Sequence, residues 1–167
     1  MNIRIEEPGD IPATHRVEQA AFGRAAEADL VDALRAHGKA TLSLVAEEGG
    51  EIVGHVFFSP VRLRIESGEH AALGLGPVAV LPERQGQGIG SALIRRGLEM
   101  LPPGLAVFLE GNPKYYARFG FVDAGDFGIK CQFNPPPGCF MLHEPAPEGI
   151  KGLQGTIYYS EEFETVG

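Results

Sequence analysis

Three closely spaced glycines separate a short apolar segment from a helix-like segment in this chain. The run from Leu75 to Met100 reads LGPVAVLPERQGQGIGSALIRRGLEM, with glycines at 86, 88 and 90. A helix start carries unpaired N–H groups and a partial positive charge, and both hold an anion. Glycine lacks a Cβ, so the backbone can approach a bulky phosphate and adopt positive φ angles. These residues predict a loop for a phosphorylated ligand, with the Ser91 hydroxyl at the same end of the helix.

A second motif follows downstream, where a pair of tyrosines precedes a Gly-Phe pair. The segment from Gly111 to Phe121 reads GNPKYYARFGF and follows the apolar, strand-like stretch from Leu105 to Leu109. A tyrosine hydroxyl is a candidate proton or hydrogen-bond donor to a leaving group. The alternative is a structural role, in which the aromatic ring packs in the core and its hydroxyl hydrogen-bonds another protein group.

Together the two motifs resemble the GCN5-related N-acetyltransferase (GNAT) superfamily. QGQGIG, from Gln85 to Gly90, is similar to its acetyl-CoA pyrophosphate loop, QxxGxG, and Tyr116 matches a tyrosine that lies beside the coenzyme sulfur. With the ending FMLHEPAPEGIKGLQGTIYYSEEF, nearly the whole chain resembles the YhbS-like branch of predicted N-acetyltransferases. The resemblance implies one acetyl-CoA-dependent N-acetyltransferase domain over residues 1–167, of the α/β (α+β) class. Its mixed central sheet would have splayed strands four and five and about four flanking helices.

The same resemblance implies where acetyl-CoA, the co-substrate, would lie. The coenzyme would occupy a V-shaped cleft, with its pyrophosphate on the loop amides and its pantetheine arm paired to the preceding strand. The implied coenzyme-binding residues are Val78, Ala79, Val80, Gln85, Gly86, Gln87, Gly88, Ile89, Gly90, Ser91 and Asn112. Asn112 departs from the commoner layout, in which an Asn precedes the Tyr by more residues. Three flanking arginines, Arg84, Arg95 and Arg96, are either phosphate contacts or solvated surface residues.

For catalysis we expect Tyr116 to protonate or hydrogen-bond the departing thiolate, with Tyr115 as the alternative. Glu110 is the candidate general base, because a partly desolvated carboxylate at that strand end could have a raised pKa. Ordered water is the alternative route for the proton. The same resemblance implies that a backbone N–H around Val78 would stabilise the oxyanion. His55, on an apolar strand, is expected to be a satisfied core histidine rather than a base.

Composition narrows the class of protein. The chain has 22 acidic and 14 basic residues, a net charge of −8, and no dense Lys/Arg run, which argues against a nucleic-acid partner. It lacks a signal peptide and any apolar stretch of membrane-spanning length, which predicts a cytoplasmic protein without a membrane partner. Cys131 and Cys139 lack metal-binding spacing, so no metal and no disulfide are expected.

Periodicity predicts a mixed sheet, antiparallel early, with a parallel strand–helix–strand unit at the glycine loop. Asp10 is expected to cap a helix that continues to Phe22. Further helices are expected over 26–36, 89–100 and 113–119. Strands are expected around Ile3 and over 41–47, 52–64, 70–80, 105–109, 120–122, 139–143 and 155–159. Gly97 would permit close helix–sheet packing.

The predicted reaction is acetyl transfer from acetyl-CoA to a primary amine of an unidentified small molecule or peptide, by direct attack in a ternary complex. The acceptor pocket is expected to combine residues 21–27 with 131–137, and a homodimer is a possible assembly. One alternative is an acyl-CoA-binding sensor or interaction domain without turnover. Another is a dinucleotide-binding oxidoreductase, although its third glycine comes one place early here and too little chain precedes the loop.

Overall fold

The computed structural model describes residues 1–166 and divides the chain into two compact units. The first contains Met1–Ser59, Gly76–Leu101 and the residues from Glu161 on, and the second contains Pro60–Leu75 and Pro102–Ser160. Two long strands, β3 (Glu51–Ile65) and β4 (Gly68–Val80), contribute to both units. The prediction of one domain over residues 1–167 stays a prediction.

In the first unit, the strand order is β1-β2-β3-β4, with β1 at Asn2–Ile5 and β2 at Leu42–Glu48. The β1–β2 and β2–β3 pairs are antiparallel, and Ala46 lies opposite both Ile3 and Gly54. The register shifts between Ala46 and Glu47, just before the turn into β3. These pairs confirm that the early part of the sheet is antiparallel, as the periodicity predicted.

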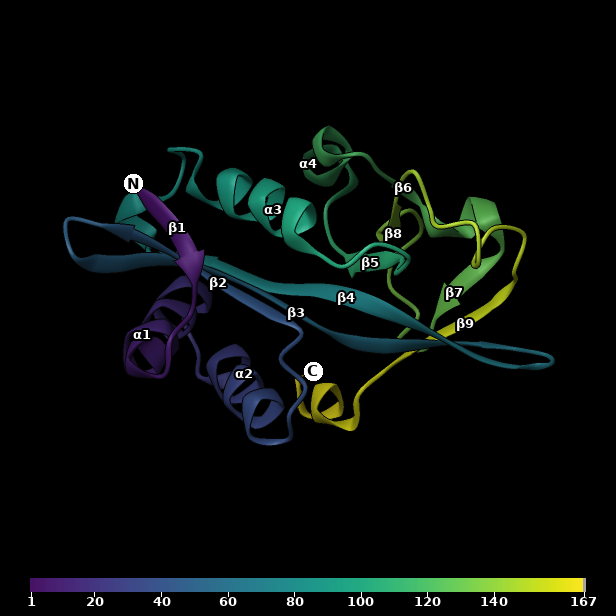
Figure 1. The fold of residues 1–167 in the computed structure, drawn as a ribbon, viewed down its shortest axis with the longest axis horizontal. Helices are drawn as coiled ribbons and strands as arrows, with labels where there is room; N and C mark the ends of the chain where they lie inside the picture. Colours follow the sequence, from purple (N-terminus) through teal and green to yellow (C-terminus); the bar gives the residue numbers. More distant parts are fainter. Residues whose placement is uncertain (167) are drawn as a thin grey trace. The chain divides into compact units, whose positions relative to one another are not determined.

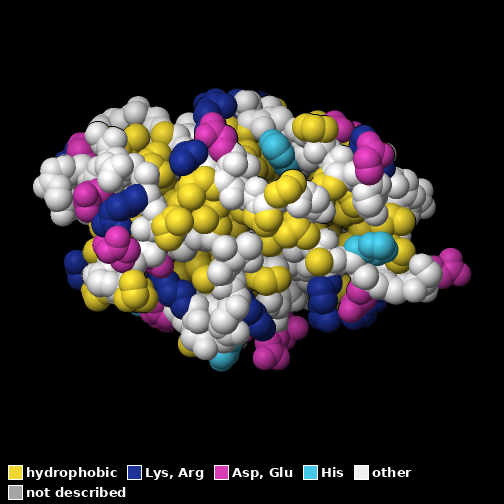
Figure 2. Space-filling view, viewed as in Figure 1, with side chains coloured by type: hydrophobic (Ala, Val, Ile, Leu, Met, Phe, Trp, Pro, Cys, Tyr) yellow, Lys and Arg dark blue, Asp and Glu magenta, His cyan; other side chains and the backbone are white. Residues whose placement is uncertain are grey.

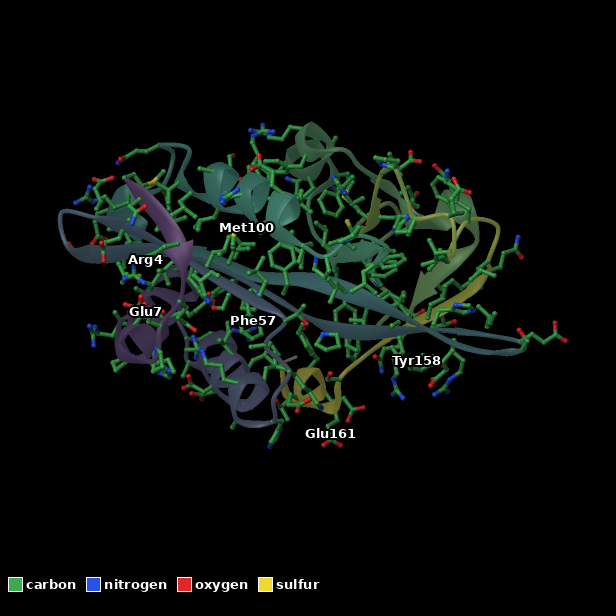
Figure 3. The ribbon with its side chains drawn as sticks, viewed as in Figure 1. Arg4, Glu7, Phe57, Met100, Tyr158 and Glu161 are labelled. Atoms are coloured by element: carbon green, nitrogen blue, oxygen red, sulfur yellow. The ribbon has the colours of Figure 1, made fainter. Side chains whose placement is uncertain are left out.

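Three helices cover this part of the sheet: α1 (Ile11–Phe22), α2 (Ala26–Ala36) and α3 (Ile89–Met100). Helices α1 and α2 lie on one side of it and α3 on the other (Figure 1). Phe57 of β3, labelled in Figure 3, packs with Leu30, Val31 and Leu34 of α2. On the other side, a Cβ added to Gly97 would lie 2.6 Å from the Phe58 ring, so the expectation of close helix–sheet packing is confirmed.

The second unit contains β5 (Val107–Glu110), β6 (Phe121–Asp123), β7 (Ile129–Cys131), β8 (Phe140–His143) and β9 (Gly155–Tyr159). Its strand order is β9-β3-β4-β5-β8-β6, and β7 pairs with β9. Strands β4 and β5 are parallel, with Leu73 opposite Val107 and Gly74 opposite Phe108. Apolar side chains from β3, β5, β8 and β9, including Leu63, Phe108, Leu142 and Ile157, form its core.

The chain also contains short helical segments outside its longer helices. One is the α-helix α4 (Pro113–Tyr116), and the others are 3-10 helices: η1 (Pro8–Asp10), η2 (Pro82–Arg84), η3 (Ala117–Phe119), η4 (Ala124–Phe127) and η5 (Glu161–Thr165). The predicted helix over 113–119 is therefore α4 followed directly by η3. Strand β7 was not predicted, because three residues are too few to show a periodicity.

One capping prediction is wrong. Asp10 occupies the N-cap position of α1, but its φ of −83° is helical and its side chain makes no cap hydrogen bond. Instead, the carboxylate accepts hydrogen bonds from Arg4, at 2.6 Å, and from the Glu7 N–H, at 2.8 Å. Arg4 on β1, labelled in Figure 3, thus binds the Asp10 carboxylate in place of the helix N–H groups.

The mixed sheet with its parallel β4–β5 pair confirms the predicted α/β class. Acidic and basic side chains are interspersed on the face seen in Figure 2. Within residues 1–166, no helix combines the length and apolar character required to cross a membrane.

Candidate active site

The glycine loop runs from the end of β4 to the start of α3, entirely within the first unit. Gln85 is extended, whereas Gly86 and Gly88 have φ angles of 78° and 84°. Side chains with a Cβ rarely adopt these angles, so both positions favour glycine for their backbone conformation. A Cβ at either position would meet nothing within 4 Å. Glycine is therefore required at both positions by the backbone conformation and not by crowding, and the space beside the loop backbone is open.

Helix α3 presents its N-terminus to this loop. Gly88 is the N-cap residue, no side chain caps the helix, and the Ala92 N–H donates to the Gly88 carbonyl at 3.0 Å. The N–H groups that come before Ala92 have no acceptor within the helix. Such N–H groups at a helix start bind anions. Residues 85–88 are exposed, while Ile89 is buried and anchors the helix to the sheet. The expected phosphate site has the required backbone geometry.

Side chains near the loop are already partly engaged. The Gln85 side chain donates to the Val80 carbonyl at 3.0 Å and holds the loop against the end of β4. Arg84 is ion-paired with Glu48 at the end of β2, and Arg96 with Glu99 at 3.2 Å. These two arginines therefore have carboxylate partners in the protein, so neither is a preformed phosphate contact.

Tyr116 lies in the second unit among aromatic rings. Its ring packs edge-on against Tyr115 and Phe121, with centroids 5.0 and 6.1 Å away, and tilted against Phe119. Burial and the neighbouring Tyr115 raise the pKa of Tyr116 to about 12. Among the described residues, no group hydrogen-bonds its hydroxyl. The Tyr116 hydroxyl is thus protonated and can donate a hydrogen bond to a ligand.

Two residues beside Tyr116 set its position. Asn112 is the N-cap of α4, and its side-chain oxygen accepts a hydrogen bond from the Lys114 N–H at 3.0 Å. A Cβ on Gly111 would overlap the Tyr116 ring, so only glycine fits there. Our sequence reading missed Gly111, although a glycine directly after an apolar strand and before Asn112 was the available signal.

Glu110 does not have the environment expected of it. It ends β5 opposite Phe140 and is exposed, rather than partly desolvated. The last residue of the strand is exposed to solvent, and the role of Glu110 as general base stays a prediction. Glu110 and Asn112 share the second unit with Tyr116, whereas Val78, Ala79, Val80 and the loop residues belong to the first.

His55 is a core residue, as expected. It is fully buried, with Nε2 2.7 Å from the Ser43 Oγ and Nδ1 2.7 Å from a Glu18 oxygen. The Ser43 hydroxyl donates to Glu6 at 3.1 Å, so its oxygen must accept from His55 Nε2–H. One proton then lies between His55 Nδ1 and Glu18. Burial, opposed by His55, raises the pKa of Glu18.

One group of side chains has the composition of a metal site. The ligand atoms of His15, Asp29 and Asp32 lie within 4.8 Å of one another. His15 Nδ1 is 2.8 Å from an Asp32 oxygen, and Arg35 binds the other Asp32 oxygen at 2.9 Å. These hydrogen bonds hold His15 and Asp32 together without an ion.

Comparison with known proteins places the chain in a family. Residues 2–123 match the acetyltransferase (GNAT) domain family. The uncharacterized N-acetyltransferase YhbS of Escherichia coli (strain K12) is 36% identical over 166 residues, which cover 98% of each protein. The chain belongs to the GNAT family of N-acetyltransferases, and the resemblance to its YhbS-like branch is confirmed.

Two solved structures extend this result to the fold. The crystal structure of E. coli YhbS in complex with CoA has a TM-score of 0.89 and 35% identity, and covers 99% of this chain and 93% of that one. A GNAT family acetyltransferase from Brucella melitensis in complex with acetyl-CoA has a TM-score of 0.79 and 40% identity, with 97% of each chain covered. The mixed α/β fold read from the strands is therefore the GNAT fold.

Proposed function

We propose that this protein transfers an acetyl group from acetyl-CoA to a primary amine of a small molecule or peptide, by direct attack in a ternary complex. The observation that carries the proposal is the uncapped start of α3 behind Gly86 and Gly88. Relatives that were crystallised with CoA and acetyl-CoA support the choice of donor. The amine acceptor itself, a cytoplasmic location and a homodimer stay predictions from the sequence.

Donor binding rests on the backbone of the loop. The amides of Gln85–Gly90 and the Ser91 hydroxyl would receive the pyrophosphate, while Val78, Ala79 and Val80 would pair with the pantetheine arm. The exposed loop and its positive φ angles support this assignment, since a phosphate can approach the backbone without meeting side chains.

In the chemical step, the neutral amine attacks the thioester carbonyl, a C–N bond forms, and the C–S bond breaks with the thiolate as leaving group. Tyr116 donates a hydrogen bond to the departing sulfur. Because its pKa is raised to about 12, above the usual thiol value of about 8.5, Tyr116 keeps its proton in the resting enzyme. Its main effect is to stabilise negative charge on sulfur through this hydrogen bond, and the released thiolate then takes a proton from solvent to give free coenzyme thiol.

The amine must also lose a proton. Glu110 is the candidate acceptor, and its exposed position favours transfer through water rather than by a desolvated carboxylate. A backbone N–H around Val78 would hold the oxyanion. Asn112 supports Tyr116 by capping α4, in addition to the coenzyme contact that the family resemblance implied.

The decisive experiment measures thiol release from acetyl-CoA with a panel of amino acids, polyamines, peptides and drug-like amines. Amine-dependent release, together with acetylated product by mass spectrometry, would establish the transferase and name the acceptor class. Tight acetyl-CoA binding without release on any amine would instead support the acyl-CoA sensor. Retention of a nicotinamide dinucleotide, with no affinity for acetyl-CoA, would overturn the proposal altogether.

A further inference from the structure

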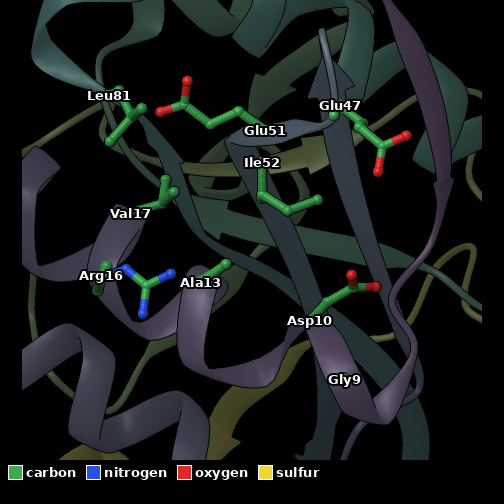
Figure 4. Close-up of a pocket in the computed structure, with 10 residues that line it drawn as sticks. Gly9, Asp10, Ala13, Arg16, Val17, Glu47, Glu51, Ile52 and Leu81 are labelled. Atoms are coloured by element: carbon green, nitrogen blue, oxygen red, sulfur yellow. The ribbon is translucent and has the colours of Figure 1, made fainter.

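The first unit contains a second concave site, on the side of the sheet that carries α1. A cavity of about 380 Å³ lies between α1 and the turn that joins β2 to β3 (Figure 4). Small-molecule sites in proteins have volumes of roughly 300–1,000 Å³. The cavity is therefore large enough for a metabolite of amino-acid size.

The floor of this cavity is apolar. Ala13 and Val17 of α1 face Ile52 of β3, and Leu81 closes one side. Val17 and Ile52 belong to one buried cluster, with Ala13 and Leu81 packed against it. Such a floor suits an aliphatic side chain, because burying it removes apolar surface from water.

The rim carries charges of both signs. Asp10 and Glu47 line the cavity but are both held by Arg4, at 2.6 and 3.0 Å. Arg16 and Glu51 also line it, and neither side chain has an ion pair or hydrogen bond within residues 1–166. Figure 4 shows the Arg16 guanidinium on one side of the floor, with Asp10 and Glu47 on the other. One positive and one negative group are thus available to a ligand.

The mouth of the cavity is open at two glycines. A Cβ added to Gly9 or Gly50 would meet nothing within 4 Å. Both residues line the cavity, so a ligand can approach their backbone without displacing a side chain.

We propose that this cavity binds a zwitterionic α-amino acid with an aliphatic side chain. Arg16 receives the carboxylate, Glu51 and the carboxylates beside Arg4 receive the ammonium group, and the apolar floor holds the side chain. A purely anionic ligand would meet three carboxylates, and a simple amine would meet Arg16 without a partner for it. A zwitterion satisfies both signs of charge. This site is separate from the glycine loop, and the inference does not depend on the proposed acetyl transfer.

The test is isothermal titration of the full chain, without acetyl-CoA, with L-leucine and two matched analogues. 3-Methylbutylamine lacks the carboxylate, and 4-methylpentanoate lacks the amine. We expect L-leucine to bind and each analogue to bind at least about tenfold more weakly, as the loss of a charge-assisted hydrogen bond implies. Equal affinity for all three ligands, or no heat with L-leucine at millimolar concentration, would overturn the proposal.

Variants then locate the binding. Arg16→Gln and Glu51→Gln change exposed side chains and should leave the thermal unfolding midpoint unchanged. Each is expected to weaken L-leucine binding about tenfold, while Arg62→Gln, which removes an exposed arginine of the second unit, is the matched control and should have no effect. If L-leucine binds Arg16→Gln and Glu51→Gln as tightly as the parent, the amino acid occupies another site, such as an acceptor site, and the inference fails.

Discussion

In the first unit, buried polar side chains form a connected network of charged and hydrogen-bonded groups, whereas in the second unit Tyr116 lies half-buried among aromatic rings. His55 has a partner on each ring nitrogen, and Glu6 is held by two hydrogen bonds from Arg35, at 2.6 and 2.8 Å. The Tyr116 hydroxyl has no partner within the described chain. A polar group whose partners are all protein groups stabilises the fold, but one without a partner is available to a ligand.

His55 and Tyr116 are both candidates for proton transfer from the sequence, but their surroundings differ. His55 is the more familiar acid–base residue, yet it is buried and its hydrogen bonds are committed. Tyr116 is the weaker acid, yet it can donate. The largest test of this difference lies at the glycine loop, because both the transferase and the acyl-CoA sensor require it to bind acetyl-CoA.

The largest effect is expected from Gly88→Glu. The φ of 84° strains any side chain there, and the added carboxylate would repel a phosphate, so acetyl-CoA affinity should fall at least about 100-fold. The matched control is Gly38→Glu, at a φ of 71° with equally open space but outside the loop. Titration of acetyl-CoA measures both. An equal loss in the two variants would mean that general strain, not the loop, is responsible.

The loss of stability on replacing Glu18 should depend on whether the new side chain can hydrogen-bond His55. Glu18→Ala leaves His55 Nδ1 without its partner and is expected to lower the free energy of unfolding by about 3 kcal/mol or more. Glu18→Gln retains a hydrogen-bond donor to Nδ1 and should cost much less. Urea unfolding measures both, and an equally large loss for Gln and Ala would contradict the shared-proton arrangement.

The same pair also predicts a pH dependence. The pKa of Glu18 is raised in the folded state, so its contribution to stability is fully present below about pH 4.5 and declines as the pH rises through the folded pKa. Glu18→Gln removes this titration. Its stability relative to the parent should therefore improve as the pH rises above 4.5, and a constant difference across that range would refute the sign.

For Tyr116→Phe we expect kcat to fall about 10–100-fold with little change in KM, because the lost hydrogen bond strengthens as charge develops on sulfur. The ring packing is retained, so stability should change little. Tyr115→Phe is the control on the adjacent ring. Were Tyr115→Phe the more damaging of the two, the roles of the tyrosines would have to be exchanged.

The smallest effect concerns the C-terminal 3-10 helix. Burial alone would raise the pKa of Glu162, but hydrogen bonds from Lys39 and His37 lower it to about 2. Its stabilising contribution is therefore present above about pH 4.5 and is lost as the pH falls toward 2. Glu162→Gln should flatten this part of the stability profile, whereas the exposed Glu164→Gln should not. Unfolding at a series of pH values measures the difference.

Much of the fold was predictable because its signals are local. The helices over 26–36 and 89–100 and the hairpin before β4 follow from apolar periodicity and from glycines at the turns. The short strand β7 and the 3-10 segments other than η3 were not predicted, because such short segments show no readable periodicity. The site divides in the same way: the loop was predictable, while the surroundings of Glu110 were not.

The amino-acid sequence by itself determined the glycine loop, since positive φ angles at Gly86 and Gly88 and an uncapped helix start depend on neighbouring residues alone. It also placed Tyr116 within a short helical segment after an apolar strand. Only the tertiary structure decided that Glu18 lies beside His55, that Glu48 engages Arg84, that Arg4 takes the Asp10 carboxylate and that Glu110 faces solvent. These pairs and exposures depend on how separate elements pack, and that packing, rather than local conformational preference, brings the side chains together.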